Sequence, residues 1–460
     1  MKTISRKTLF LAIAGISAAG AVGTAQAVSV APTQLGQVLI YPYYTVKGTD
    51  ASPYNTLLSV VNTTASTKAV KVRFREGKGS AEVLDFNLFL SPYDVWTAEL
   101  DPSSSGGTKM FTGDTSCTIP KIPATGVEFR NGKYVGDAYK DNSLTRLREG
   151  YFEIIEMGTY ASDHTIAINS KHTAAGVPKD CTAVTDSAAA TGIEQPTGGL
   201  SGTVSLVQPT KGFNAATNAV ALTDFSQIGQ YYTTADDLPT LDAADKWSVT
   251  VTDTSTRWWG GWTTGIDAVS AALMKASVIN EYVLDTATAS ATDWVVTFPT
   301  KWAYVSNLGG AAKAPFQSAA SSSGSCDDII MTYWSREEQQ VTPSGSDFSP
   351  KPSTPGISIC WEANVVSFNG KNVFGSSNTL SAAVIFQNGW ARIDFKGKMT
   401  TPDAIAVQFG LNGVSTYATS ATYTGLPAIG FAVQTFNPGT NAYAGTFTHS
   451  YTEKINYDQK

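Results

Sequence analysis

The sequence predicts a mainly β protein made of antiparallel, immunoglobulin-like β-sandwiches with long inserts and one or two helices. Two observations lead to this fold class. Short runs of apolar and aromatic residues alternate with polar ones at the period of two that is typical of strands. The intervening residues are mostly Ser, Thr, Gly, Ala and Asn, and only 15% of the 460 residues are charged. Closely spaced strands with no helical period between them favour a sandwich.

The N-terminal segment has the three parts of a signal peptide. Three cations within Met1–Lys7 precede an apolar run, and Ala25-Gln26-Ala27 offers a small-x-small cleavage site before Val28. We therefore predict that residues 1–27 are removed and that the mature protein is exported to the periplasm, the cell surface or the extracellular medium. An uncleaved membrane anchor is the alternative, which the short apolar run, diluted by Gly and Ala, disfavours.

The charge and length of the mature chain limit which partners it can bind and how many domains it can contain. The leader holds three of the 32 Lys and Arg residues and none of the 38 Asp and Glu, so the mature chain has a formal charge of −9, 29 against 38. This balance argues against binding to nucleic acid or to an anionic membrane surface. No later apolar stretch has the ~20 residues of a transmembrane segment. The length predicts an N-terminal β-sandwich with inserts over 28–235 and a second β-rich region with one helix over 236–460.

The N-terminal half shows strand after strand. In Val70–Arg75 apolar and cationic residues alternate, so we expect the apolar ones to face a core and Lys71, Arg73 and Arg75 to face water. The polar stretch 62–68 is predicted to connect this strand to its predecessor as a hairpin. Inserts are predicted at 101–150 and 163–199. The other predicted strands are Thr56–Val61, Glu82–Leu90, Asp94–Leu100, Tyr151–Met157, Leu200–Val207 and Ala219–Phe225.

The second half begins with the one convincing helical pattern. Apolar residues from Ile266 to Leu284 fall on one helical face, and Asp267 suits the positive end of the helix dipole. We predict that this helix packs on a sheet. The strands predicted after it are Thr292–Thr300, Trp361–Phe368, Ala382–Phe386, Ala391–Phe395, Ile405–Phe409, Ala428–Phe436 and Tyr443–His449.

Four cysteines allow three disulfide pairings. Because an exported chain is oxidised by default, we predict the bridges Cys117–Cys181 and Cys326–Cys360, each closing a polar, loop-rich segment with much entropy to lose. A metal or haem site is the alternative, which the absence of Cys-x-x-Cys and of short-spaced Cys/His clusters disfavours. We expect no cofactor and no metal ion.

The sequence contains few of the residues and motifs that are typical of catalytic sites. The three histidines are scattered, and the chain has no Gly-x-Ser-x-Gly, phosphate-loop or His-Glu-x-x-His motif. No catalytic residue is therefore assigned. Paired carboxylates, as in glycoside hydrolases, remain an alternative, with Asp293 and Glu362 beside tryptophans as the better candidates. A carboxylate next to a tryptophan on a strand is more often a solvated alternate residue.

The tryptophans of Trp258-Trp259-Gly260-Gly261-Trp262 are the strongest candidates for ligand binding, because exposed flat rings stack on sugars or anchor partners. The competing interpretation is that Trp258, Trp259 and Trp262 fill the gap between helix and sheet. We favour this second interpretation, with at most one ring contacting a ligand.

Three stretches, Asn55–Thr64, Leu84–Trp96 and Thr292–Lys301, together resemble an uncharacterised family of exported bacterial β-rich proteins. They cover under a tenth of the chain. The family has no established activity, so the resemblance implies bacterial export and no catalytic residue.

Together these features predict an exported structural or binding protein of the cell surface or periplasm that works without catalysis. Its expected partners are a polysaccharide, other surface proteins or further copies of itself. The alternative is a secreted carbohydrate-active enzyme or carbohydrate-binding protein that uses paired carboxylates and tryptophans. An enzyme needs acids that converge in a cleft, a binding module needs exposed aromatics on a shallow face, and an assembling protein needs an uncovered edge strand.

Overall fold

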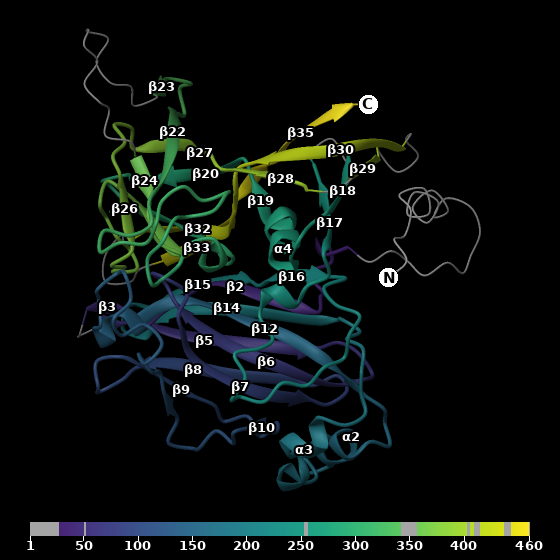
Figure 1. Ribbon diagram of the computed structural model, residues 1–460. Coiled ribbons are helices and arrows are strands. Elements are labelled where there is room, and N and C mark those ends of the chain that lie inside the picture. The colour runs from purple at the N-terminus through teal and green to yellow at the C-terminus, as the bar shows by residue number, and fades with distance from the viewer. Residues whose placement is uncertain are drawn as a thin grey trace.

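The computed structural model of the chain describes residues 27–49, 52–252, 256–341, 357–402, 405–408, 415–436 and 443–459 (Figure 1). The predicted signal peptide, except for its last residue, lies outside this part of the chain. The described sheets are antiparallel, apart from one parallel pairing of β25 (Ala363–Phe368) with β26 (Thr379–Ala382). The mainly β class is confirmed, and the immunoglobulin-like strand order stays a prediction.

Two sheets of the N-terminal half enclose a common core. Tyr41 of the first sheet stacks on Phe152 at 4.0 Å between ring centroids and donates a hydrogen bond to the carbonyl of Ser59 in the second. In pairing order, the first sheet contains β1 (Ser29–Val30), β16 (Val220–Thr223), β2 (Val38–Thr45), β12 (Glu149–Tyr160), β6 (Thr67–Glu76), β7 (Glu82–Leu90) and β10 (Thr118–Ile119), with β13 (Ile193–Glu194) on β12. The second contains β11 (Val127–Glu128), β9 (Thr108–Phe111), β8 (Val95–Pro102), β5 (Asn55–Asn62), β14 (Leu200–Gln208) and β15 (Phe213–Asn218).

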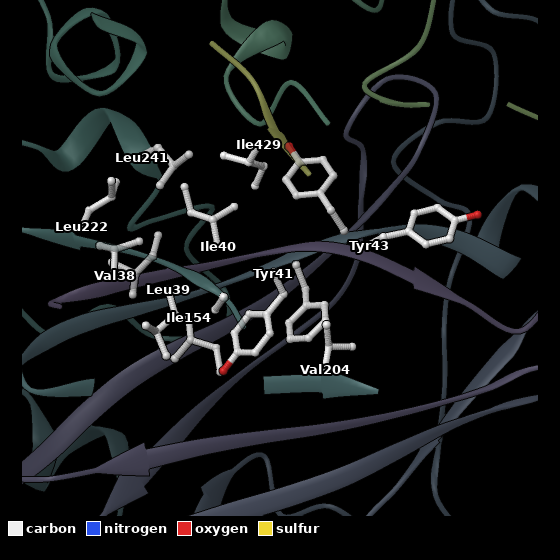
Figure 2. Close-up of a cluster of buried hydrophobic side chains, with 14 of the residues drawn as sticks. Val38, Leu39, Ile40, Tyr41, Tyr43, Ile154, Val204, Leu222, Leu241 and Ile429 are labelled. Atoms are coloured by element: carbon white, nitrogen blue, oxygen red, sulfur yellow. The ribbon is translucent and has the colours of Figure 1, made fainter. Parts of the chain in front are cut away.

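The first sheet is covered on both faces, which buries β2 along its whole length. Figure 2 shows Tyr41 on the side of Val204, which belongs to the second sheet. On the opposite face of β2, Ile40 lies toward Leu241 and Ile429 of the C-terminal half. One hydrophobic cluster therefore runs through both halves, and the domain boundary at residue 235 stays a prediction.

Three larger sheets form the C-terminal half. The first has β17 (Trp247–Val251), β18 (Arg257–Gly261), β29 (Ile405–Gln408), β30 (Ser415–Thr424) and β28 (Lys398–Thr400), with β35 (Lys454–Gln459) on β30. The next has β23 (Gln340–Val341), β22 (Asp327–Ser335), β27 (Asn388–Phe395), β20 (Ser277–Val283) and β34 (Ser450–Thr452), with β24 (Ile357–Ile359) on β22. The last has β26, β25, β21 (Ala291–Thr297), β32 (Ile429–Phe436) and β33 (Tyr443–Thr448). Short pairs join β3 (Gly48–Thr49) to β4 (Ser52–Pro53) and β19 (Met274–Lys275) to β31 (Leu426–Pro427).

The predicted helix is half as long as expected. The helix α4 (Gly265–Leu273) begins after Thr264, whose hydroxyl accepts a hydrogen bond from the backbone N–H of Asp267, and only Asp267 of its nine residues is not buried. Beyond Leu273 the chain enters β19 and β20, so the prediction of helix to Leu284 is wrong. In β20 the buried Val278 and Tyr282 are four residues apart, a spacing that fits one face of a helix or of a strand, and pairing with β27 and β34 decides for strand.

Two further local predictions are wrong. β5 pairs with β8 and β14, whereas β6 pairs with β7 and β12, so residues 62–68 cross between sheets and form no hairpin. Of the stretch Ala382–Phe386, only its first residue belongs to a strand. The remaining described helical elements are α2 (Thr165–Ser170), α3 (Asp186–Ala189) and the 3₁₀ turns η2 (Leu144–Arg148), η3 (Cys181–Ala183), η4 (Pro209–Lys211), η5 (Leu241–Ala243) and η6 (Lys301–Ala303).

The two predicted disulfides are confirmed. Cys117 bonds to Cys181 and Cys326 to Cys360. The first bridge ties β10 at the sheet edge to the insert that carries α2, and the second ties β22 to the chain entering β25. Over the described residues, no helix is both long and apolar enough to cross a membrane.

Candidate functional site

The predicted tryptophans lie mostly inside the protein. Because side chains alternate along β18, Trp258 points to the same side as Trp262, and they are 6% and 4% exposed. Trp262 donates from Nε1 to Ser248 Oγ at 2.8 Å. Both rings belong to the hydrophobic cluster that contains Ile266 of α4. Trp259 points the other way and is partly exposed. A ligand contact by one of the three therefore stays a prediction, for which Trp259 has the accessible ring.

The two candidate acids are buried and held apart from solvent. Asp293 lies in β21 and Glu362 just before β25, and both are 0% exposed. Burial raises the pKa of Asp293 to about 7 and that of Glu362 to about 8. Asp293 accepts a hydrogen bond from the backbone N–H of Phe374, and Glu362 accepts one from the hydroxyl of Ser80 at 2.6 Å. Each acid thus has its own buried surroundings, and neither side chain is exposed to solvent.

The three histidines serve local structure. The His164 ring accepts from the backbone N–H of Ile166 at the start of α2, and His172 lies 3.6 Å from Asp94. His449 contacts the carbonyl of Val295 through Nε2 at 3.0 Å, and burial lowers its pKa to about 4. Within the described residues, no three His, Cys, Asp or Glu side chains converge in a way that could hold a metal ion.

The cations of β6 are buried, contrary to the prediction that they face water. Lys71 pairs with Asp85 at 3.1 Å, Arg73 with Glu82 at 2.7 Å and Arg75 with Glu153 at 3.2 Å. The positive and negative side chains come from neighbouring strands, so an acid on an adjacent strand neutralises each cation.

Two segments from outside the sandwich cover this charged face. Lys71 donates to the backbone carbonyl of Thr233, and the guanidinium of Arg75 lies 5.1 Å from the ring centroid of Trp302. The predicted alternation of apolar and cationic faces along β6 is thus correct, but a second layer of the protein covers the face that was expected to meet solvent. We interpret the charges as structural, because each has a partner charge within the sheet.

A cavity with a volume of about 560 Å³ opens beside this face. Apolar walls come from β7 and from the insert 101–150, including Leu84, Met110 and Ile122. Glu82 and Lys133 stand at its rim. Its size and mixed lining fit a small molecule. The charged lining residues are Lys121, Arg130, Lys133, Glu82 and Asp85.

A stacked pair of tryptophans lies on another surface, the outer face of the sheet of β22 and β27. The strand register places Trp334 opposite Trp390, and their rings stack with centroids 3.8 Å apart and planes 7° apart. Trp390 is 37% exposed, Trp334 is partly exposed, and Ile330, farther along the same face of β22, is 44% exposed. The opposite face of the same strands is buried, for example at Tyr333. Alternation along both strands therefore forces the two tryptophans outward.

Charged groups surround this tryptophan pair. The guanidinium of Arg392 lies 5.9 Å from the Trp334 ring centroid and donates to Asp394 at 3.0 Å. Glu281 of β20 stands opposite Trp390 in the register and is exposed. Flat apolar rings beside charged hydrogen-bonding groups can pack on the C–H face of a sugar while bonding its hydroxyls.

Sequence reasoning missed this surface because its residues are far apart along the chain. Each tryptophan alternates with inward residues in its own strand, which marks it as outward. Nothing in the sequence aligns the two strands. Comparison of the chain with protein-family models, with curated proteins and with solved structures found no match. The resemblance to an exported bacterial family therefore stays a prediction.

Proposed function

We propose that this is an exported, non-catalytic protein of the cell surface or periplasm that binds polysaccharide through the face carrying Trp334 and Trp390. The observation that carries the proposal is this stacked pair, with Trp390 exposed and Trp334 partly exposed, on a sheet whose other face is core. Exposed apolar patches mark interaction sites on many proteins, and large aromatic rings contribute strongly to binding when a partner covers them.

Two features support export and one supports the absence of catalysis. Both disulfides suit an oxidising compartment. Val28, the predicted first residue of the mature chain, is buried and bonded through its N–H to the carbonyl of Trp247 at 2.8 Å, so cleavage before it leaves an anchored start. The candidate acids Asp293 and Glu362 are buried in separate places, which disfavours the alternative of a glycoside hydrolase.

Binding to insoluble polysaccharides tests the proposal. The parent protein should co-sediment with at least one member of a panel of cellulose, chitin and peptidoglycan. The variant W334A/W390A should lose this binding by tenfold or more while its circular dichroism is unchanged. Tyr443→Ala is the matched control, because it removes a ring that is 59% exposed on the other sheet's edge strand β33.

The outcomes separate the candidate functions. Failure of the parent to bind any member of the panel, or undiminished binding by W334A/W390A, would contradict the proposal. A parent that forms oligomers, broken by Tyr443→Ala, would favour assembly through β33 instead. Among the described strands, β33 pairs only with β32, so it is an edge strand of its sheet.

A further inference from the structure

The cavity beside the charged face of β6 lies where the edge of β7 has no partner strand. β10 pairs with Asn87 and Leu88 of β7, and the backbone N–H of Arg130 donates to the carbonyl of Val83 at 2.9 Å. Between these two contacts, residues 84–86 line the cavity. Over the described residues, no strand pairs with this stretch on the side away from β6. The cavity therefore lies where a further strand would pair.

One wall of the cavity is apolar and continuous with the core. Val83, Phe86 and Met110 are buried members of the hydrophobic cluster, and Leu84 and Ile122 pack against that cluster while staying partly exposed. The volume of about 560 Å³ lies within the range of about 300–1,000 Å³ that is typical of small-molecule sites. A ligand with an apolar body would remove these side chains from water, which favours binding.

The two acids that line the cavity are already neutralised. Asp85 pairs with Lys71 and Glu82 pairs with Arg73. Both cations belong to β6 and are buried. Because each acid has a buried cation of its own, the pair of acids offers little net negative charge to a cationic ligand.

The basic residues of the cavity leave positive charge over. Lys133 pairs with Asp237 at 2.8 Å on the exposed surface. Lys121 and Arg130 also line the cavity and are exposed, and neither has an acidic partner among the residues that the structure describes. Guanidinium and ammonium groups bind carboxylates through charge-assisted hydrogen bonds. The charge of the cavity therefore favours an anionic group.

The open edge of β7 adds a backbone donor. The N–H of Phe89 donates to the carbonyl of Cys117, on the side away from β6. Along a strand, the backbone groups of every second residue point to the same side. The N–H of Asp85 therefore also points away from β6, and Asp85 lines the cavity. A ligand oxygen there can accept a hydrogen bond from this N–H.

We propose that this cavity binds a small amphipathic anion, a carboxylate on an apolar chain, as in a medium-chain fatty acid. The chain packs on Leu84, Met110 and Ile122, and Lys121 and Arg130 bind the carboxylate. The proposed polysaccharide-binding tryptophans do not line the cavity, so this inference does not rest on the proposed function.

Calorimetric titration of the purified protein compares three ligands that share one chain length. The probes are decanoate, decan-1-ol and decyltrimethylammonium, each kept below its solubility or micelle limit. Decanoate should bind once per chain and at least tenfold more tightly than the neutral and cationic probes. A protein that does not bind decanoate, or binds decan-1-ol equally well, would overturn the proposal without any variant.

A charge variant tests the two cations. Lys121→Gln with Arg130→Gln should weaken decanoate binding at least tenfold. Lys179→Gln with Lys211→Gln is the matched control, because it removes the same charge from exposed lysines that do not line the cavity. Equal affinities for the two double variants would overturn the assignment of the carboxylate to Lys121 and Arg130.

Two further variants locate the chain of the ligand. Ile122→Trp places a larger side chain in the cavity and should weaken decanoate binding at least tenfold, with circular dichroism as the check on folding. W334A/W390A should bind decanoate as the parent does, whatever its affinity for polysaccharide. A folded Ile122→Trp variant with parental affinity, or loss of decanoate binding in W334A/W390A, would overturn the location of the site.

Discussion

The buried carboxyl of Asp293 makes the stability of this protein dependent on pH in a way that one substitution should remove. Asp293 lies in β21 on the face toward the N-terminal half, where its Oδ2 accepts from the backbone N–H of Phe374 and its Oδ1 has no partner. Burial raises its pKa from the ordinary 3.8 to about 7. Replacement by Asn keeps the shape and removes the ionisation.

The sign and size of the effect follow from proton linkage. An acid with a raised pKa in the folded state binds its proton more tightly there, so the free energy of unfolding falls as pH rises above the unfolded value of 3.8 and levels off above about 7. With ~1.4 kcal/mol per pKa unit, this carboxyl should cost the folded protein about 2–3 kcal/mol more at about pH 8 than at about pH 5. Asp293→Asn should lack this loss.

Urea unfolding of the disulfide-bonded protein at these two pH values measures the difference. The stability of Asp293→Asn relative to the parent should increase by about 2–3 kcal/mol from the lower to the higher pH. Asp328→Asn is the control, because Asp328 is exposed and its removal takes away no buried carboxyl. If the parent and Asp293→Asn differ by the same amount at both pH values, Asp293 is not a buried neutral acid and the reasoning fails.

Three further predictions concern stability. Trp262→Ala should destabilise the fold by ~3–5 kcal/mol, since it removes a buried ring, and Trp259→Ala should cost clearly less; equal melting temperatures for the two variants would contradict the assignment. Arg146→Met should cost ~3–5 kcal/mol in urea unfolding, because it strips a bidentate partner from Glu76 and leaves buried acids unpaired. Replacing both Cys117 and Cys181 by Ser should cost ~2–4 kcal/mol in thermal or urea unfolding, and a variant as stable as the parent would show that the bridge is dispensable.

Local patterns were sufficient for the parts of this protein that depend on neighbouring residues. The period of two located Glu82–Leu90 as β7, with the same bounds in the structure. The start of α4 was indicated by Asp267, whose backbone N–H is capped by Thr264. The disulfides could be paired from sequence because each bridge joins loop-rich segments within one half of the chain.

The predictions were wrong where pairing with another strand, or packing against another layer, determines the conformation or the burial of a segment. A strand can share its residues with a helical pattern, as β20 does, until pairing with β27 makes one choice stable. The cations of β6 alternate like solvent-facing residues, but the segments that contain Thr233 and Trp302 cover them. Alternation fixes which side chains share a face and carries no information on whether that face meets water.

The candidate sites also include features that the sequence determines and features that only the tertiary structure determines. The sequence alone was enough to infer the strands, the oxidised state of the cysteines, the excess of acidic over basic residues and the tryptophan content. Each of these depends on residue type or on short-range spacing. Tertiary structure alone decided that Trp258 and Trp262 are buried while Trp334 and Trp390 meet on an exposed face. It also decided that Asp293 and Glu362 lie inside the protein. The physical reason is that burial and proximity arise from contacts between residues distant in the chain, which strand register and layer packing determine.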